Sequence, residues 1–323
     1  MAFEVILLHR MSWKGYDGLI YRFLKSCELF SVPIFMIIAF YLCANTLEEG
    51  NNERIKNRFI RLIIPQIGWA VVCWVVYVIT DIVFAHKLSH NLMDLAIAII
   101  SGCRQNTNPS TWFQAVLILL TIIYCVIFKI FNKRKAWYVV YLTLVISVFI
   151  QQSGIYYDFF ENMPYEINNT IGRIFEMMPY AALGLCLRHY QIFEQYIKKR
   201  YIVIAVSLFL FTAGFKITFP VFKGFFAGIY PVYMALWLFL IFLFLPFEKI
   251  SFEIKPRILQ LTKYTLGIYC AHRLVYGILD IVYELAEINP GSFLKCILVY
   301  ITCYIMSYVM CLFPFEVFKK MVD

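Results

Sequence analysis

The chain has 323 residues, of which 62% are hydrophobic and only 15% are charged, and its mean hydropathy is +0.74. A soluble domain of this size could not bury so much apolar surface, so the composition excludes a soluble enzyme, a disordered chain and a nucleic-acid-binding protein. The net charge of +9 is explained by basic loops that orient membrane helices and lie against anionic lipid.

Nine apolar segments approach the roughly 20 residues that a helix needs to cross about 30 Å of hydrocarbon. Lipid cannot satisfy open backbone groups, so all nine are predicted to be helices. In chain order they cover 28–46, 62–84, 112–131, 136–151, 171–187, 201–219, 228–246, 264–285 and 293–314.

Two shorter apolar segments complete the expected fold. Residues 2–9 are apolar except for Glu4, but eight helical residues rise only about 12 Å. They are expected to be part of a truncated first helix, or to follow a start codon that is placed too late. Residues 91–100 are too short to span and are expected to be interfacial or re-entrant. The predicted fold class is therefore all-α: a single polytopic membrane bundle over 1–323, with about ten transmembrane helices.

Basic residues predict the orientation of this bundle. Four loops and the C-terminal tail hold 18 of the 29 Lys and Arg residues. Their order between the predicted helices places all five on the same side of the membrane. They are 48–61, 129–135, 188–200, 248–263 and the tail with Lys319 and Lys320. The opposite loops are poor in basic residues. The C-terminus is therefore predicted to be cytoplasmic.

The ten cysteines do not suggest a disulfide framework. Eight lie inside apolar runs, where thiols act as small hydrophobic groups; they are Cys43, Cys73, Cys125, Cys186, Cys270, Cys296, Cys303 and Cys311. Only Cys27 and Cys103 fall in polar flanks, and their spacing alone does not specify a bridge.

Ionisable residues inside apolar segments are candidates for function because burying them in a membrane is costly. His9 lies near the predicted outer face and could act as a general base on a hydroxyl, or it is simply an interfacial histidine. His272, followed by Arg273, lies early in an apolar helix and could orient a substrate or pack structurally. Arg173 and Glu176 have a spacing that permits an ion pair.

Three further residues lie at predicted membrane interfaces. Arg58 and Arg61 are three residues apart on one helix face, where two guanidinium groups could bind phosphates or only anchor the helix to the cytoplasmic surface. Trp112 begins a helix at the outer interface, where tryptophan is common whatever the function. His86, His90 and His189 lack the spacing of metal ligands, so no metal site is expected.

Several short motifs occur in a fixed order along nearly the whole chain. They are Phe30-Ser-Val-Pro-Ile-Phe, Arg58-Phe-Ile-Arg61 followed by Pro65, Asn108-Pro-Ser-Thr-Trp112-Phe, Pro179-Tyr-Ala-Ala-Leu-Gly184 and Thr265-Leu-Gly-Ile-Tyr269-Cys-Ala-His272. Together with an early apolar segment that carries His9, this order resembles the acyltransferase-3 family of bacterial integral membrane acyltransferases. The chain departs from the family pattern at Ala39-Phe40, where the family has Ser-Gly, and at Ser110 or Thr111, where it has histidine.

The resemblance implies a function. Members of this family take an acyl group, often acetyl, from cytoplasmic acyl-CoA and pass it to a hydroxyl of an extracytoplasmic polysaccharide or lipid-linked sugar. It implies that Arg58 and Arg61 bind the phosphates of CoA, that His9 is catalytic, and that Trp112, Tyr269 and His272 line the substrate cavity. It also implies a multi-pass protein of the bacterial cytoplasmic membrane that uses acyl-CoA as donor substrate, without a tightly bound cofactor.

Two alternatives remain open at this point. A transporter or flippase of a lipid-linked sugar or acylated metabolite needs no acyl donor, and prolines such as Pro33, Pro65 and Pro179 could break its helices. A catalytically inactive family member could act as a scaffold in an envelope-glycan complex, which the incomplete first helix would support.

Overall fold

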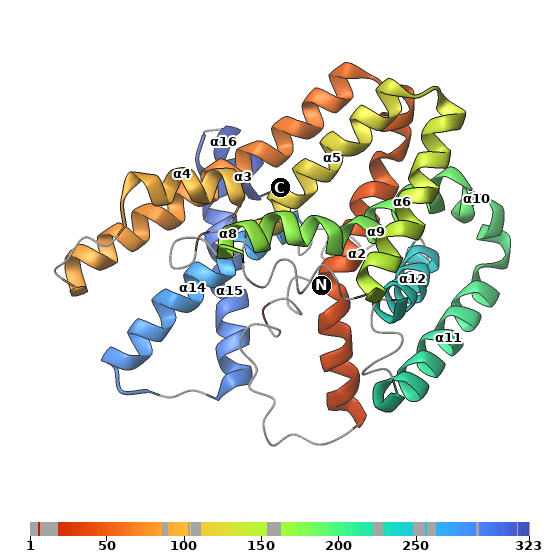
Figure 1. The fold of residues 1–323 in the computed structure, drawn as a ribbon. Coiled ribbons are helices and arrows are strands. Elements are labelled where there is room, and N and C mark those ends of the chain that lie inside the picture. The colour runs from red at the N-terminus through yellow and green to blue at the C-terminus, as the bar shows by residue number, and fades with distance from the viewer. Residues whose placement is uncertain are drawn as a thin grey trace. The chain divides into compact units, whose positions relative to one another are not determined.

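The computed structural model describes residues 6, 19–85, 90–102, 104, 111–153, 163–221, 229–247, 256, 263–288, 291–314 and 316–322. This part of the chain is almost entirely helical and contains no strand. Each of the nine predicted apolar segments coincides with a helix; the nine are α2 (Leu19–Glu49), α3 (Asn52–Thr80), α5 (Trp112–Ile130), α6 (Lys133–Ser153), α9 (Arg173–His189), α11 (Arg200–Val221), α12 (Ile229–Phe244), α14 (Thr265–Leu285) and α15 (Ser292–Leu312). Figure 1 shows these helices.

Shorter helical segments link the long ones: η1 (Asp81–Ala85), α4 (Leu92–Ser101), α8 (Tyr165–Ile167), η2 (Asn168–Gly172), α10 (Ile192–Tyr196), η3 (Ile197–Lys199) and α16 (Glu316–Val322). Within the described residues, six helices are long and apolar enough to cross a membrane, over Phe30–Glu49, Asn52–Val83, Trp112–Ile130, Lys133–Ser153, Thr265–Leu285 and Phe293–Leu312. The prediction of an all-α polytopic membrane bundle is confirmed.

The first two long helices begin about nine residues earlier than predicted, because helical hydrogen bonding continues beyond the apolar stretch that hydropathy detects. α2 ends at Glu49, and the next residue, Gly50, has a φ of +63°, the left-handed conformation that favours glycine. Directly after it, the side-chain oxygen of Asn51 accepts a hydrogen bond from the backbone N–H of Arg54 at 3.1 Å. This contact caps α3, so its polar first turns, which carry the basic residues, are helical as well.

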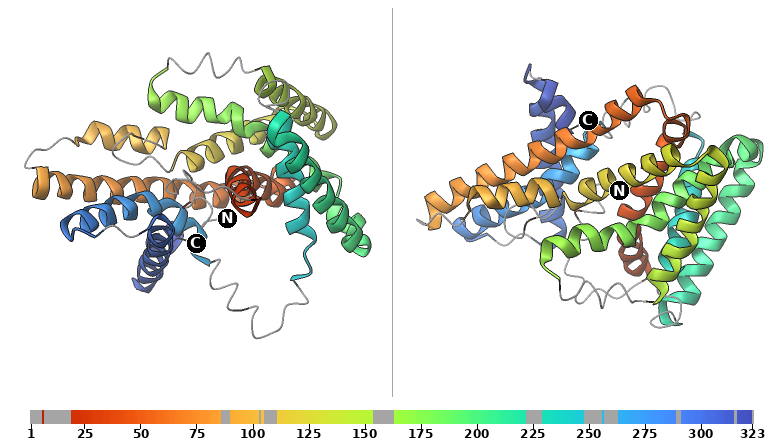
Figure 2. Two further views of the ribbon diagram at one scale, coloured as in Figure 1. Left: turned by 90° about the horizontal axis from the view of Figure 1, so that it is seen from below. Right: turned by 45° about the horizontal axis from the view of Figure 1, so that its top comes forward.

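The chain contacts divide into two compact units. Unit 1 consists of Met1–Glu28, Arg58–Ala115 and Ser251–Asp323, and unit 2 of Leu29–Asn57 and Val116–Ile250. In unit 2, α6 packs against α9, and α11 against α12 (Figure 2). Gly184 of α9 lies against the backbone of α2, where a Cβ would collide with the carbonyl oxygen of Ile37. The absent side chain therefore permits this close helix contact.

In unit 1, α14 and α15 run antiparallel and α16 packs against both. The hydroxyl of Tyr276 lies 3.3 Å from Cys296 Sγ near one end of the pair, and Gly267 faces Ser307 near the other. α3 presents a row of exposed apolar side chains four residues apart, which suits lipid; they are Ile63, Ile67, Val71, Val75 and Ile79.

The short helix α4 lies antiparallel alongside α3 within unit 1 (Figures 1 and 2). Gln66 Nε2 donates to the carbonyl of Ile99 at 3.1 Å, and Trp74 Nε1 donates to the carbonyl of Asn91 at 2.9 Å. A helix that lies in the plane of the interface would cross α3 rather than follow it. The structure therefore favours the re-entrant interpretation of this segment over the interfacial one.

The eight cysteines that are expected to pack as apolar side chains form no disulfide bridge with one another, and all of them except Cys311 are buried. Their burial agrees with the expected role as small apolar side chains. The side chains of Cys27 and Cys103 lie outside the described residues.

The glycine that ends α4 supplies a stability test. Gly102 has a φ of +73°, and a Cβ on it would lie 2.5 Å from Ala115 Cβ and 2.9 Å from the Thr111 carbonyl oxygen. Gly50 has a similar φ, but a Cβ there would meet nothing within 4 Å. Gly50→Ala should therefore cost about 1 kcal/mol from backbone strain alone, and Gly102→Ala about 3 kcal/mol because overpacking is added. Unfolding of the two variants in detergent measures the difference, and equal costs would contradict the close packing of Gly102 against the start of α5.

Candidate functional site

The two arginines of the predicted phosphate-binding pair lie on α3 in unit 1. Arg58 is half-buried and Arg61 is exposed. At three residues apart, their side chains leave the helix about 60° apart, so both can contact one anionic group. Arg54 on the same helix is exposed and pairs with Glu49 at 3.1 Å. It is therefore a suitable comparison for the arginine pair.

The predicted cavity residues are joined by a run of aromatic rings in unit 1. The ring of Trp112, half-buried at the start of α5, lies 6.2 Å from that of Phe113. The ring of Phe113 meets the edge of Tyr269 on α14 at 5.6 Å, and Tyr269 lies 5.9 Å from the ring of His272. The structure therefore brings Trp112, Tyr269 and His272 together. The linking residue Phe113 was not singled out from the sequence, because its role depends on where α14 packs.

His272 is completely buried on the inner face of α14. Its Nδ1 faces the carbonyl oxygen of Tyr269, one turn earlier on the helix. A carbonyl oxygen only accepts hydrogen bonds, so Nδ1 of His272 carries a proton and donates it to this oxygen. This contact fixes the orientation of the imidazole.

The predicted catalytic residue His9 lies outside the described residues. Ile6, three residues earlier in the chain, is described and is completely buried. Its carbonyl accepts a hydrogen bond from the hydroxyl of Tyr276 at 3.1 Å. Tyr276 is one helical turn after His272, so α14 of unit 1 contacts the chain close to the segment that carries His9.

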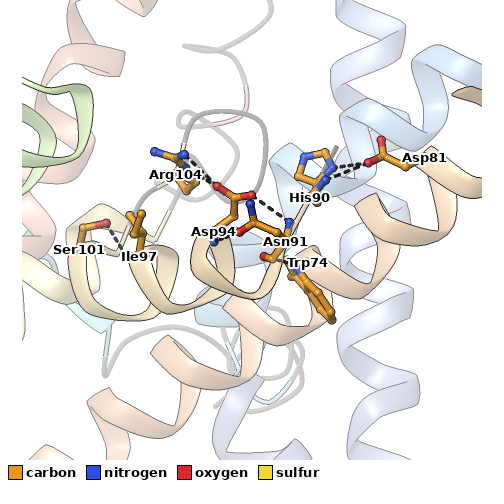
Figure 3. A network of polar contacts seen from close by, with 8 residues as sticks. All are labelled: Trp74, Asp81, His90, Asn91, Asp94, Ile97, Ser101 and Arg104. Carbon is orange, nitrogen blue, oxygen red and sulfur yellow. Dashed lines mark hydrogen bonds and ion pairs between the residues drawn. The ribbon is translucent and has the colours of Figure 1, made fainter. Parts of the chain in front are cut away.

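A polar network fastens the end of the α3–α4 hairpin (Figure 3). His90 Nδ1 lies 2.8 Å from Asp81 Oδ2, and the ring of Tyr77 stacks on His90 with centroids 5.4 Å apart. Because the carboxylate accepts, Nδ1 of His90 is the donor in this pair. Both side chains are largely buried, so the pair joins η1, which follows α3, to the residue just before α4.

The network continues through a capping box at the start of α4 (Figure 3). Asn91 and Asp94 each accept the other's backbone N–H at 3.0 Å, and Arg104 binds Asp94 Oδ1 through Nε at 2.9 Å. These donors, first the backbone N–H of Asn91 and then Arg104, hold the pKa of Asp94 below its usual value of 3.8, against the opposing effect of burial. The sequence did not reveal this network, because its partners come from separate elements that the fold brings together.

The predicted ion pair of Arg173 and Glu176 forms in unit 2. Arg173 and Glu176 of α9 make the ion pair that their spacing permits, through Arg173 Nη1 and Glu176 Oε2. They belong to unit 2, whereas the arginine pair and the aromatic run belong to unit 1. Among the described residues, no group of three or more His, Cys, Asp or Glu side chains is arranged to hold a metal ion.

Two buried glutamines of unit 1 were also missed in the sequence. Gln66 and Gln114 are 3% and 1% exposed, respectively. An amide inside an apolar segment is a detectable signal, but glutamine carries no charge and is easily overlooked beside arginine and histidine.

The fold and the site define a polytopic helical membrane protein with a basic helix, a run of aromatic rings and a buried histidine in one unit. A comparison with protein families matches residues 2–313 to the acyltransferase-3 family model, which is described as an acyltransferase domain. The chain belongs to this family and is a membrane acyltransferase. Searches of curated proteins and of solved structures gave no significant match.

Removing the charge of Asp94 tests the network around α4. The pKa of Asp94 is lower in the folded than in the unfolded protein. The ionised carboxylate therefore stabilises the fold at any pH above the pKa of the unfolded protein, and this contribution is lost as the pH falls through the pKa of the folded protein. Asp94→Asn should therefore cost about 2 kcal/mol at pH 7, with a difference from wild type that shrinks below about pH 4. Thermal unfolding at several pH values measures this, with the exposed Glu53→Gln as control. A pH-independent difference would contradict the ionic role.

Proposed function

We propose that the protein transfers an acyl group, acetyl in the simplest case, from cytoplasmic acyl-CoA to a hydroxyl of an extracytoplasmic glycan or lipid-linked sugar. The observation that supports the proposal most is that unit 1 of this acyltransferase-3 family member contains most of the predicted site residues. This unit combines the arginine helix α3 with α14, which bears His272 and holds Ile6 near the segment of His9. The protein acts in the bacterial cytoplasmic membrane with its C-terminus in the cytoplasm, as the basic loops predict.

The reaction exchanges a thioester for an ester. Arg58 and Arg61 bind the phosphates of CoA, which places the donor at the basic side of the membrane. The acceptor hydroxyl loses its proton to His9, and its oxygen attacks the thioester carbonyl. The C–S bond breaks, an ester C–O bond forms, and the CoA thiolate takes up a proton. Trp112, Tyr269 and His272 line the passage in which these groups meet.

The geometry of α14 supports an orienting role for the buried histidine. Its Nδ1 donates to the Tyr269 carbonyl, and this contact holds the imidazole in one orientation. Tyr269 in turn contacts Phe113 and through it Trp112. A change at any member of this run would therefore alter the shape of the passage.

Acetyl transfer by the purified protein tests the proposal. The protein in lipid nanodiscs, given acetyl-CoA labelled in the acetyl group and a surface glycan, should release CoA and label the glycan. His9→Ala should lower kcat by 10²-fold or more, because general-base assistance is lost. Arg58→Gln combined with Arg61→Gln should raise KM for acetyl-CoA by about tenfold or more with a smaller effect on kcat.

The matched control is Arg54→Gln, which removes the same charge from the same helix. Arg54 forms an exposed ion pair with Glu49, so its loss should have little effect. A wild-type protein that moves a lipid-linked sugar across the membrane without consuming acyl-CoA would contradict the proposal and identify a transporter. An unchanged kcat in His9→Ala would remove this residue from the mechanism.

A further inference from the structure

Gln114 is a buried amide with no hydrogen-bond partner among the described residues. It lies in the first turn of α5, directly after Trp112 and Phe113, and is 1% exposed. Neither its Oε1 nor its Nε2 forms a hydrogen bond within the described part of the chain. Burying an amide without a partner is costly, and an apolar side chain of similar size would avoid the cost. The amide is therefore explained best by a ligand that offers both a donor and an acceptor.

A second amide lies in the same part of unit 1. Gln66 is 3% exposed, and its Nε2 donates to the carbonyl of Ile99, while its Oε1 has no partner among the described residues. A Cβ on Gly102 would lie 3.1 Å from Gln66 Nε2 and 2.5 Å from Ala115 Cβ. Gln66 and the first turn of α5, which contains Gln114, thus pack around one glycine.

The position of Gln66 on α3 relates these amides to the arginine pair. Gln66 follows Arg58 by eight residues, which is a rise of about 12 Å along the helix. Acyl-CoA carries phosphates at one end, two secondary amides along its pantetheine arm and the thioester at the other end. Phosphate-binding arginines followed along one helix by a buried amide match this order of chemical groups.

We propose that Gln114, together with Oε1 of Gln66, binds a secondary amide of the pantetheine arm of acyl-CoA. A primary amide is complementary to a secondary amide: Nε2 of Gln114 donates to the ligand carbonyl, and Oε1 of a glutamine accepts the ligand N–H. This inference rests on the proposed function, because it takes acyl-CoA as the donor. It adds two binding residues and a part of the donor that they recognise.

Comparing the binding of two ligands tests this inference separately from the proposed function. CoA contains the pantetheine arm, whereas 3′-phospho-ADP has the same phosphates and adenosine but lacks the arm. In binding measurements with the intact protein in nanodiscs, Gln114→Met should weaken CoA binding about tenfold, as expected for the loss of the neutral hydrogen bond from Nε2 to the ligand carbonyl, and should leave 3′-phospho-ADP binding unchanged. Arg58→Gln should weaken the binding of both ligands.

The matched control for Gln114→Met lies on the same helix. Tyr124 of α5 is completely buried in unit 2, and its hydroxyl has no hydrogen-bond partner in the described part of the chain. Tyr124→Phe also removes a buried polar atom from α5, but it should change the affinity for neither ligand. If Tyr124→Phe weakened CoA binding as much as Gln114→Met, the assignment of Gln114 would be overturned.

The two proposals fail in different ways. If the wild-type protein binds neither ligand, the proposed function is wrong. If the wild type binds CoA and Gln114→Met binds it equally well, only the present inference is wrong. Unchanged CoA affinity in Gln114→Met is also the result expected if Gln114 binds the sugar acceptor instead.

Thermal unfolding without ligand supplies a readout that does not depend on binding. Replacing a buried amide that lacks a partner should leave Tm unchanged or raise it. A fall of more than about 5 °C in Gln114→Met and in a second variant, Gln114→Leu, would show that the amide has a structural role and would overturn the proposal. Failure of both variants to fold would also show that the amide has a structural role and would overturn the proposal.

Discussion

Each polar group inside a helix bundle that is surrounded by lipid must find its partner within the protein, and this constraint organises unit 1. α3 satisfies it with side chains that donate to backbone carbonyls at the ends of its neighbours. Gln66 donates to Ile99 in the last turn of α4, and Trp69 donates at 2.9 Å to the carbonyl of Met321 near the end of α16. The last turn of a helix has carbonyls without an intrahelical partner, so these contacts stabilise both the donor and the helix end.

The same constraint distinguishes structural polar groups from functional ones. Thr111 is completely buried and donates to the carbonyl of Gly102 at 2.6 Å, which joins the end of α4 to the start of α5. Gln114, three residues later, has no such contact among the described residues. A short stretch of α5 therefore contains one polar side chain that the fold requires and one that the fold leaves available for a ligand.

The long helices were predictable because an apolar stretch in lipid has few alternatives to a helix. The pair Arg58 and Arg61 was also found from the sequence, since spacing along one helix fixes how two side chains lie. The roles of these arginines, and that of His9, stay predictions. The direction of α4 and the contact of Phe113 with Tyr269 could not be predicted, because they depend on side chains that the fold brings together from distant parts of the chain.

The account holds that unit 1 receives the acyl donor, and photo-crosslinking tests this most directly. A CoA analogue with a photoreactive group on its pantetheine arm would be bound to the protein in lipid nanodiscs, irradiated, and located by mass spectrometry of the labelled peptides. The account predicts labelling of the peptides that contain Gln66, the start of α5 and the inner face of α14, with competition by unlabelled acetyl-CoA. The account would be contradicted if the labelling that unlabelled acetyl-CoA competes away were found only in peptides of α6, α11 or α12 in unit 2.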